Sequence, residues 1–356
     1  MMLKWLLIFV PVTVVLEYVV HPPDAIIFIS AALSIIPIAA LMGEATEHLA
    51  VKTGPTIGGL LNATFGNATE LIIAFFALRA GKIAVVKASI AGSMIANMLL
   101  VLGLALFLGG LKHKKQVFNK DVAGALSSLL LIVMIAFLVP AIFDFTERVE
   151  GISPAQALIS DEHFSLAASF VLIGLYACNL IFSLVTHKDL LSGSNDHGGE
   201  AWPVRRGILT LVACTLTVAW LSEILVGSLE GFSQQLGLTE VFAGLIIIPI
   251  IGNAAEHAAS VFALKNKLDL AIQIALGATI QIALLVAPLL VLVSFAIGQP
   301  MDLVIHRPLE LVGLFGATVI TASVARDGET NWLEGAMLLG VYVLLALAFF
   351  FLPVGV

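Results

Sequence analysis

The sequence predicts an all-α polytopic membrane protein with about 11 transmembrane helices: one extra N-terminal helix and two inverted-topology five-helix repeats. First, the 356 residues are 60% hydrophobic and only 12% charged, whereas soluble domains carry about 25% charged residues. Second, apolar runs of about 20 residues, long enough to span a bilayer, recur along the chain. These runs are apolar on every face, which indicates helices rather than barrel strands. Third, one polar motif occurs twice, in the third and eighth runs.

Turn residues and charges separate the predicted spans. In chain order they cover about 3–20, 24–48, 56–80, 83–110, 121–142, 163–187, 204–230, 239–264, 268–298, 308–325 and 331–353. The first span follows Lys4, but no small-residue cleavage site follows it, so we expect a retained helix rather than a signal peptide. The predicted division is therefore an N-terminal helix, a first repeat, a cytoplasmic linker and a second repeat, at 1–21, 22–187, 188–203 and 204–356.

The distribution of positive charge predicts the orientation. Most of the 17 Lys and Arg residues fall in loops that are cytoplasmic if the N-terminus is inside. We therefore expect a cytoplasmic N-terminus and a C-terminus outside. The net charge of −7 must lie mainly in loops, and nothing in it indicates a nucleic-acid partner. Cys178 and Cys214 each lie within an apolar segment and are expected to pack rather than to form a disulfide or bind metal.

The repeated motif predicts the inverted topology. "GNATELIIAFFAL" at 66–78 matches "GNAAEHAASVFAL" at 252–264 at seven of thirteen positions. The copies fall on spans three and eight, which cross the membrane in opposite directions, so the repeats are antiparallel. Secondary transporters built in this way have interrupted helices and bind their ions near the midplane. Helix-breaking residues surround both copies, namely Pro55, Gly58, Gly59 and Gly66 in the first and Pro249 and Gly252 in the second.

Glu70 and Glu256 carry the predicted chemistry. Each lies deep in its span, where an acidic residue costs on the order of 2.5–3.5 kcal/mol. Asn67 and Asn253 precede them by three residues and share their helix faces. Carboxylates and amide oxygens are the ligands that a hard cation such as Ca²⁺ prefers. Without the cation, mutual repulsion and poor solvation favour protonation of the carboxylates. A cation and protons would then compete for one set of oxygens; the alternative is that each Glu simply hydrogen-bonds a neighbouring helix.

Other polar residues are candidates for supporting roles. Ser93 and Asn97 share a face of span four, and Thr279 and Gln281 occupy the matching part of span nine. We expect Asn97 and Gln281 to lie in or near the ion site. For Ser93 and Thr279 a helix-packing role is an equal alternative, because hydroxyl groups commonly join helices in membranes.

A third group is predicted to serve as a proton relay or in gating. Glu223 lies within span seven and is expected to be buried. Glu47, with Glu44, ends span two and is either functional or an interfacial carboxylate. His257 follows Glu256 but points about 100° away on a helix, so it is either a packing residue or a pH-sensitive neighbour.

Several function classes are excluded or disfavoured. The chain has no P-loop for ATP hydrolysis, and neither "EATEH" nor "NAAEH" is an HExxH metalloprotease motif. No convincing nucleophile–base set exists, so we expect no enzyme activity. A cation channel, with the two Glu residues as a filter, is a weaker alternative because inverted repeats are typical of transporters.

The paired "GNATELI" and "GNAAEH" motifs resemble those of the cation/proton exchanger branch of the calcium/cation antiporter superfamily. The resemblance covers residues 24–353 and implies Ca²⁺/H⁺ antiport, with Glu70 and Glu256 as the ion-binding carboxylates and Asn67 and Asn253 beside them. It also implies that spans two and seven are the gating pair. The Na⁺/Ca²⁺ exchanger branch has a proline just before the motif glutamate, where this chain has Thr69 and Ala255.

The resemblance sets further expectations. Calcium ion, protons and the lipid bilayer are the expected partners; Ca²⁺ and H⁺ are transported ions, and no cofactor is expected. A Na⁺-coupled or broader divalent-cation exchanger stays an alternative, and homo-oligomerisation is left open. Some family members carry an acidic regulatory helix between the repeats, but the acidic residues of 188–203 are only Asp189, Asp196 and Glu200. We expect a prokaryotic plasma (inner) membrane protein.

Overall fold

The computed structural model describes residues 4–187, 202–259 and 267–352. These residues are almost entirely helical, and the one sheet among them is the antiparallel pairing of β1 (Gln116–Val117) with β2 (Glu329–Thr330). The predicted all-α membrane fold is therefore confirmed. Most of the predicted linker, 188–201, lies outside the described residues.

The chain forms two compact units, each built from separate segments. Unit 1 comprises Met1–Ser89, Phe182–Ala258 and Phe350–Val356, and unit 2 comprises Ile90–Ile181 and Ala259–Phe349. Each unit therefore contains segments of both predicted repeats.

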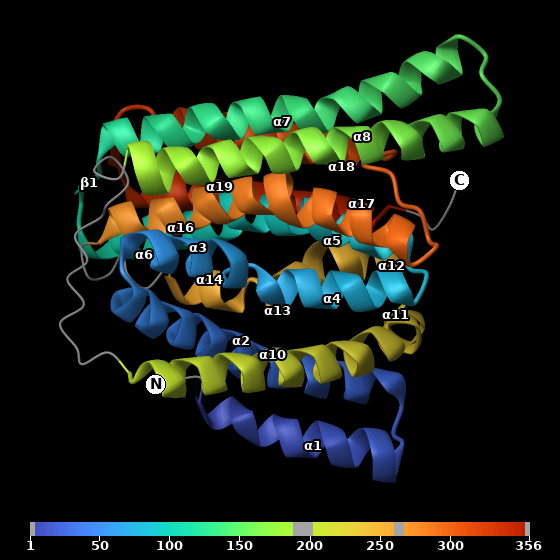
Figure 1. Cartoon of the computed structure of the whole chain (residues 1–356), viewed down its shortest axis with the longest axis horizontal. Helices are drawn as coiled ribbons and strands as arrows, with labels where there is room; N and C mark the ends of the chain where they lie inside the picture. Colours follow the sequence, from blue (N-terminus) through green and yellow to red (C-terminus); the bar gives the residue numbers. More distant parts are fainter. Residues whose placement is uncertain (1–3, 188–201, 260–266, 353–356) are drawn as a thin grey trace. The chain divides into compact units, whose positions relative to one another are not determined.

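Unit 1 holds the two motif segments and the helices that pack against them. Its elements are η1 (Lys4–Ile8), α1 (Phe9–Val15), η2 (Leu16–Val20), α2 (Asp24–Thr53), α3 (Pro55–Phe65), α4 (Ala68–Arg79), the first part of α5 (Ile83–Ile95), η4 (Phe182–Thr186), α10 (Val204–Gly227), α11 (Leu229–Leu236), α12 (Glu240–Phe242), η5 (Ala243–Ile247), α13 (Ile248–Gly252) and α14 (Ala254–Ala259). The long helices α2 and α10 run side by side (Figure 1), and α10 also packs against α4. Gly54, at φ +86°, ends α2 and allows the sharp turn into α3.

Unit 2 is a bundle of long apolar helices. Its elements are the rest of α5, η3 (Ala96–Val101), α6 (Leu102–Lys112), β1, α7 (Lys120–Val149), α8 (Pro154–Ile181), α16 (Leu268–Gln281), η6 (Ile282–Val286), α17 (Ala287–Ala296), α18 (Pro308–Val324), β2 and α19 (Trp332–Phe350). Within this unit α7 packs against α8, α16 and α18, and α8 packs against α17.

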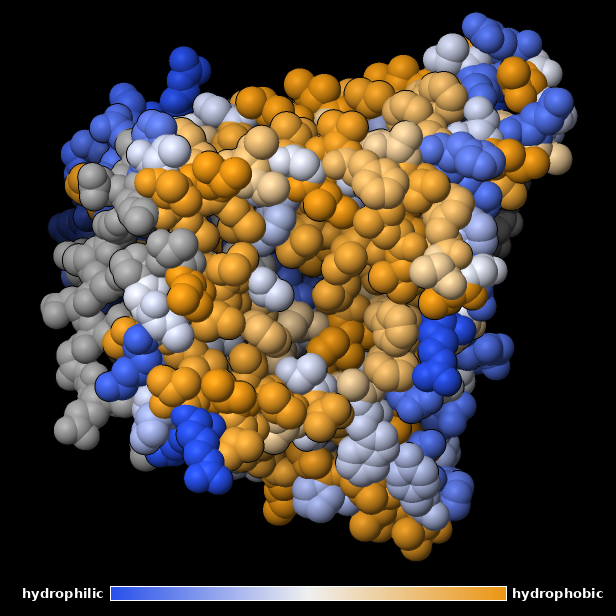
Figure 2. Space-filling view, viewed as in Figure 1, coloured by the Kyte–Doolittle hydropathy of each residue, from blue (hydrophilic) through white to orange (hydrophobic). Residues whose placement is uncertain are grey.

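The surface of α7 and α8 is typical of helices in lipid. Figure 2 shows apolar side chains along both helices and hydrophilic ones gathered around the turn that joins them. Leu131, Ile132, Ile135, Val139 and Ile142 are all exposed along α7. Because water would disfavour such a surface, these helices belong in a bilayer.

The number of spans can be compared with the eleven predicted. Seven described helices are long and apolar enough to cross a membrane, and an eighth is reached if α11 and the α12–α13 helix, which meet at 113°, count as one span. The first and tenth predicted spans are shorter helices, Trp5–Val20 and Pro308–Val324, and the third is divided into α3 and α4. The count of eleven is therefore not confirmed and stays a prediction.

Candidate ion-binding site

Both copies of the motif interrupt their helices at the same place. The first break separates α3, which ends at Phe65, from α4; the second separates α13, which ends at Gly252, from α14. The asparagine of each motif lies at the break, with ψ of 22° at Asn67 and 24° at Asn253. The interruptions predicted from the glycines and prolines are therefore confirmed. An interrupted helix exposes backbone groups that an uninterrupted helix would hide.

The breaks place each motif glutamate at the start of a half-helix. Glu70 lies in the first turn of α4, and Glu256 lies in the first turn of α14. The positive end of a helix dipole favours negative charge, and half-helix ends at membrane depth are a recurring feature of transporter ion sites. Both side chains are buried, with exposed fractions of 8% and 6%.

The two carboxylates lie close together within unit 1. A Cβ atom placed on Gly252 would lie 3.2 Å from Cγ and 3.4 Å from Oε1 of Glu70, so the Glu70 side chain packs directly against the second motif. Glu256, four residues further along, is close enough to Glu70 for the two charges to repel each other. The two copies of the motif therefore bring their acids to one place.

The oxygen atoms of this pair are poorly satisfied by the protein. Neither carboxylate oxygen of Glu70, nor Oε2 of Glu256, has a hydrogen-bond partner among the described residues. Leaving buried charged oxygens without partners is costly, so such atoms indicate a missing ligand such as a proton or a cation. Asn67 and Asn253 are also buried, at 3% and 0% exposure, beside the two glutamates.

Glu70 and Glu256 supply only two carboxylates, which limits the ligands that a bound cation could have. Within the described ranges no group of three or more His, Cys, Asp or Glu residues is placed to hold a metal ion. A cation at the motifs would therefore depend on two carboxylates together with amide and backbone oxygens. That donor set suits a hard ion such as Ca²⁺ better than a soft one.

The predicted supporting residues belong to unit 2. Asn97, Ser93 and Thr279 are buried there, and Gln281 is partly buried. Asn97 lies in the π-helical segment η3, and Gln281 immediately precedes the corresponding segment η6; π-helical turns are frequent at functional sites. Thr279 donates a hydrogen bond to the Ala275 carbonyl of its own helix, 2.9 Å away. Roles beside the two glutamates stay predictions for these four residues.

The expected burial of Glu223 is wrong. Its side chain is 62% exposed and lies 4.0 Å from Arg79. The reason is that α10 ends at Gly227, so position 223 is about one turn from the helix end rather than deep in the span. Glu47 is likewise exposed, at the other end of the unit-1 helices, and His257 is partly buried beside Glu256. The relay or gating roles of Glu47, Glu223 and His257 therefore stay predictions.

Sequence reasoning missed two groups of charged residues. In unit 1, Lys82 lies 2.9 Å from Glu240 and 3.7 Å from Glu230. In unit 2, Asp144, Asp161 and Asp302 are buried together near the α7–α8 turn. The available signal was their position: Lys82 and the three aspartates lie just outside the predicted spans, and Glu230 and Glu240 lie at span ends, where charged residues are ordinarily assigned to solvent.

Comparison with known proteins then gives the family. The model of the sodium/calcium exchanger protein family matches residues 24–185 and 206–351. The chain belongs to this family. A Ca²⁺/H⁺ antiporter of Aphanothece halophytica is 47% identical to this exchanger-family chain, covering 98% of it and 96% of the relative. The Ca²⁺/H⁺ antiporter ChaA of Bacillus subtilis is 43% identical, covering 96% of this chain and 97% of the relative.

A solved structure agrees with the fold. The crystal structure of selenium-substituted Ca²⁺/H⁺ antiporter protein YfkE matches with a TM-score of 0.83 and 39% identity, covering 98% of both chains. The resemblance to cation/proton exchangers drawn from the two motifs is therefore confirmed, and the chain is an exchanger-family membrane transporter.

Proposed function

We propose that this chain exchanges Ca²⁺ for protons across the membrane by alternating access, with Glu70 and Glu256 as the shared carboxylates. The observation that carries the proposal is the pair of buried, adjacent glutamates, of whose four carboxylate oxygens three (both of Glu70 and Oε2 of Glu256) have no hydrogen-bond partner among the described residues. We assign Asn67 and Asn253 as neighbouring oxygen ligands. Relatives along almost the whole chain are named Ca²⁺/H⁺ antiporters, which supports the same ion pair.

The exchange follows from competition for one set of oxygens. With Ca²⁺ bound, two carboxylates balance the ion's charge and their repulsion is relieved. Without Ca²⁺, the same two carboxylates repel each other in a buried site and take up protons instead. Because the site cannot hold both at once, movement of one ion in one direction is coupled to movement of the other in reverse.

The moving parts are proposed to be α2 and α10. They run side by side in unit 1, and both contact the elements that carry the motifs: α2 packs against α3 and α13, and α10 packs against α4. A shift of this pair along the motif helices would open one end of the site and close the other. Glu47 and Glu223, on α2 and α10, are proposed to serve in gating, and His257 to influence protonation of Glu256.

Two other assignments accompany the proposal. We place the protein in a prokaryotic plasma membrane with its N-terminus cytoplasmic, on the charge distribution and on bacterial relatives. Asn97 and Gln281, with Ser93 and Thr279, are proposed to support the site. A Na⁺-coupled exchanger is the second candidate, and Thr69, where that branch has a proline, disfavours it.

Transport by the purified chain in proteoliposomes tests the function. An imposed pH gradient should drive ⁴⁵Ca²⁺ uptake, and a Na⁺ gradient of equal size should not. Glu70→Gln and Glu256→Gln, which remove charge at nearly constant volume, should each lower the initial rate at least as much as the roughly 10–100-fold loss known for outer-shell metal-site residues. Glu150→Gln, at an exposed residue beyond α7, is the matched control. Ca²⁺ uptake driven only by the Na⁺ gradient would favour a Na⁺-coupled exchanger instead. Full activity of both motif variants would exclude Glu70 and Glu256 as the ion site.

A further inference from the structure

A second group of buried acids lies in unit 2, away from the motif residues along the chain. Asp144 is on α7, Asp161 is on α8, and Asp302 is in the segment between α17 and α18. Their exposed fractions are 7%, 2% and 6%. Three carboxyl groups that are each more than nine-tenths buried require compensation by cations, protons or hydrogen-bond donors.

The backbone around Asp302 fixes it against α8. The Leu303 amide donates to Ser165 Oγ of α8 at 2.8 Å, and the Val304 amide donates to Asp302 Oδ1 at 2.7 Å. Asp161 is four residues before Ser165 and therefore lies on the same face of the helix. The fold thus places Asp161 on the face of α8 that contacts the segment carrying Asp302, and the Val304 amide holds the Asp302 carboxylate in place.

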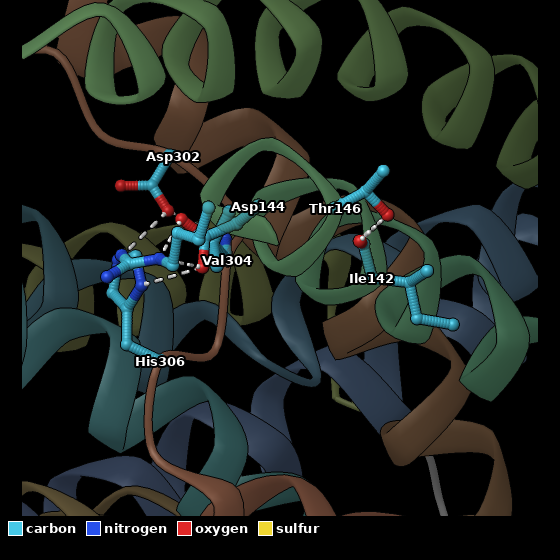
Figure 3. Close-up of polar contacts among 7 residues, drawn as sticks. Ile142, Asp144, Thr146, Asp302, Val304 and His306 are labelled. Atoms are coloured by element: carbon cyan, nitrogen blue, oxygen red, sulfur yellow. Dashed lines mark hydrogen bonds and ion pairs between the residues drawn. The ribbon is translucent and has the colours of Figure 1, made fainter. Parts of the chain in front are cut away.

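Arg148 pairs with Asp144 and the His306 ring contacts Asp144 and Asp302, but neither pairs with Asp161. Arg148 Nε lies 2.8 and 2.9 Å from the two Asp144 oxygens. His306 lies between Asp144 and Asp302 (Figure 3), with a ring nitrogen 3.8 Å from each. Within the described part of the chain Asp161 makes no ion pair, and its Oδ1 is buried without a hydrogen-bond partner.

The charges that face Asp161 are otherwise negative. Asp144 and Glu147 from α7 and Asp302 from the segment before α18 all repel a charge on Asp161, and Asp144 lies within hydrogen-bonding reach. The helix α17 and the segment η6, which also pack against α8, contain no ionisable residue. Two adjacent buried carboxyl groups with no donor between them are satisfied when they share one proton.

We propose that Asp161 and Asp144 share a proton, which makes this cluster a second proton-binding site, distinct from Glu70 and Glu256. The ligand is a proton rather than a metal ion because the described residues contain no group of three or more acids or imidazoles placed to hold a metal. The shared proton ties the start of α8 to the end of α7. Loss of the proton leaves Asp161 charged beside Asp144 and Asp302.

Infrared difference spectroscopy on the purified full chain tests this site. A Glu70→Gln/Glu256→Gln background removes the motif acids, so the result does not depend on the proposed transport site. That protein should show the carbonyl band of a protonated carboxylic acid at neutral pH. Addition of Asp161→Asn should abolish this band, whereas Asp121→Asn, at an exposed acid on α7, should leave it unchanged. A band unaffected by Asp161→Asn would overturn the proposal.

A second variant and a metal titration complete the test. Asp302→Asn removes a neighbouring negative charge, which makes a charged Asp161 less unfavourable. The protonated-acid band should therefore be lost at a lower pH than in the background protein. An unchanged titration would overturn the shared-proton arrangement. Ca²⁺ should not raise the melting temperature of the double-variant background. A rise that Asp161→Asn removes would overturn the proposal in favour of a metal site.

Discussion

Gly252 lies directly against Glu70, at the point where the second motif meets the first. Glycine at position 252 leaves room for the Glu70 carboxylate, whereas a residue with a side chain would crowd it. A Cβ atom at position 252 would lie 3.2 Å from Glu70 Cγ. The glycine of one motif therefore positions the glutamate of the other. This contact explains why a glycine precedes the asparagine of the second motif, independently of its helix-breaking tendency.

Gly252→Ala should weaken Ca²⁺ binding without unfolding the protein. The added methyl group must displace the Glu70 carboxylate by a few tenths of an ångström, because Cγ and Oε1 are its nearest neighbours. We expect about a tenfold loss of apparent Ca²⁺ affinity, in the range seen when metal-ligand orientation is disturbed. Transport measured against Ca²⁺ concentration checks this. Gly227→Ala, where a Cβ atom would meet nothing within 4 Å, is the control, and equal affinities in the two variants would contradict the positioning role.

The sequence predicted the acidic pair because the signal was duplicated. Gly-Asn-x-x-Glu occurs in two apolar segments, and a membrane-buried carboxylate is rare enough that its repetition indicates function. Glu223 has no such duplicate, and its depth was judged from position within an apolar run. Because α10 ends at Gly227, Glu223 lies about one turn from the helix end and not deep in the span as predicted. Asp161 was missed for the opposite reason: its burial depends on contacts with α7 and the 302–304 segment, which no local pattern reports.

At the scale of elements, α1 is attached to α2 by a hydroxyl cluster. Thr13 Oγ1 lies 2.6 Å from Ser30 Oγ and 2.9 Å from Ser34 Oγ. All three residues are buried. Side-chain hydrogen bonds between membrane helices average about 0.6 kcal/mol and reach about 1.7 kcal/mol. The extra N-terminal helix is therefore tied to one member of the proposed gating pair.

Thr13→Val should loosen this attachment. Valine has nearly the same shape but leaves the two serine hydroxyls without their partner on α1. We expect a loss of about 1 kcal/mol in unfolding free energy, seen as a lower melting temperature of the detergent-purified protein. Thr217→Val is the matched control because Thr217 is only partly buried and, among the described residues, its hydroxyl bonds only to the Ala213 carbonyl of its own helix. The same melting temperature in both variants would show that the cluster does not join the helices energetically.

Helix type and approximate position were accessible from hydropathy, whereas helix ends and bends were not. The broken helices at both motifs followed from glycine and proline, because these residues disturb a helix locally. The 113° bend between α11 and the α12–α13 helix occurs where Gly237 adopts a left-handed conformation. The Thr239 side chain then begins α12 by accepting a hydrogen bond from the Phe242 amide. The helix α11 and the turn after it are too short for their hydrophobic pattern to predict the direction of the next helix.

At the scale of the whole molecule, Ca²⁺ and protons should act on stability as opposed ligands of the folded state. Anything that binds only the folded protein stabilises it, by about 2.7 kcal/mol at a concentration 100 times the dissociation constant. Ca²⁺ binding at the proposed site requires both motif carboxylates to be deprotonated, so on that proposal it must release protons. Protons bound at Glu70 and Glu256 must in turn be displaced before the ion can enter.

The apparent Ca²⁺ affinity of the purified protein should therefore rise as the pH is raised. If one proton is displaced for each ion, the dissociation constant changes up to about tenfold per pH unit, and up to about a hundredfold if two are displaced. Melting temperature titrated with Ca²⁺ at several pH values measures this, and removal of Ca²⁺ with a chelator should lower the melting temperature more at alkaline than at acidic pH. In Glu70→Gln or Glu256→Gln the Ca²⁺-dependent shift should disappear, whereas Glu150→Gln should retain it. An affinity that does not change with pH in the unmodified protein would show that protons and Ca²⁺ do not compete, because shared oxygens cannot hold both.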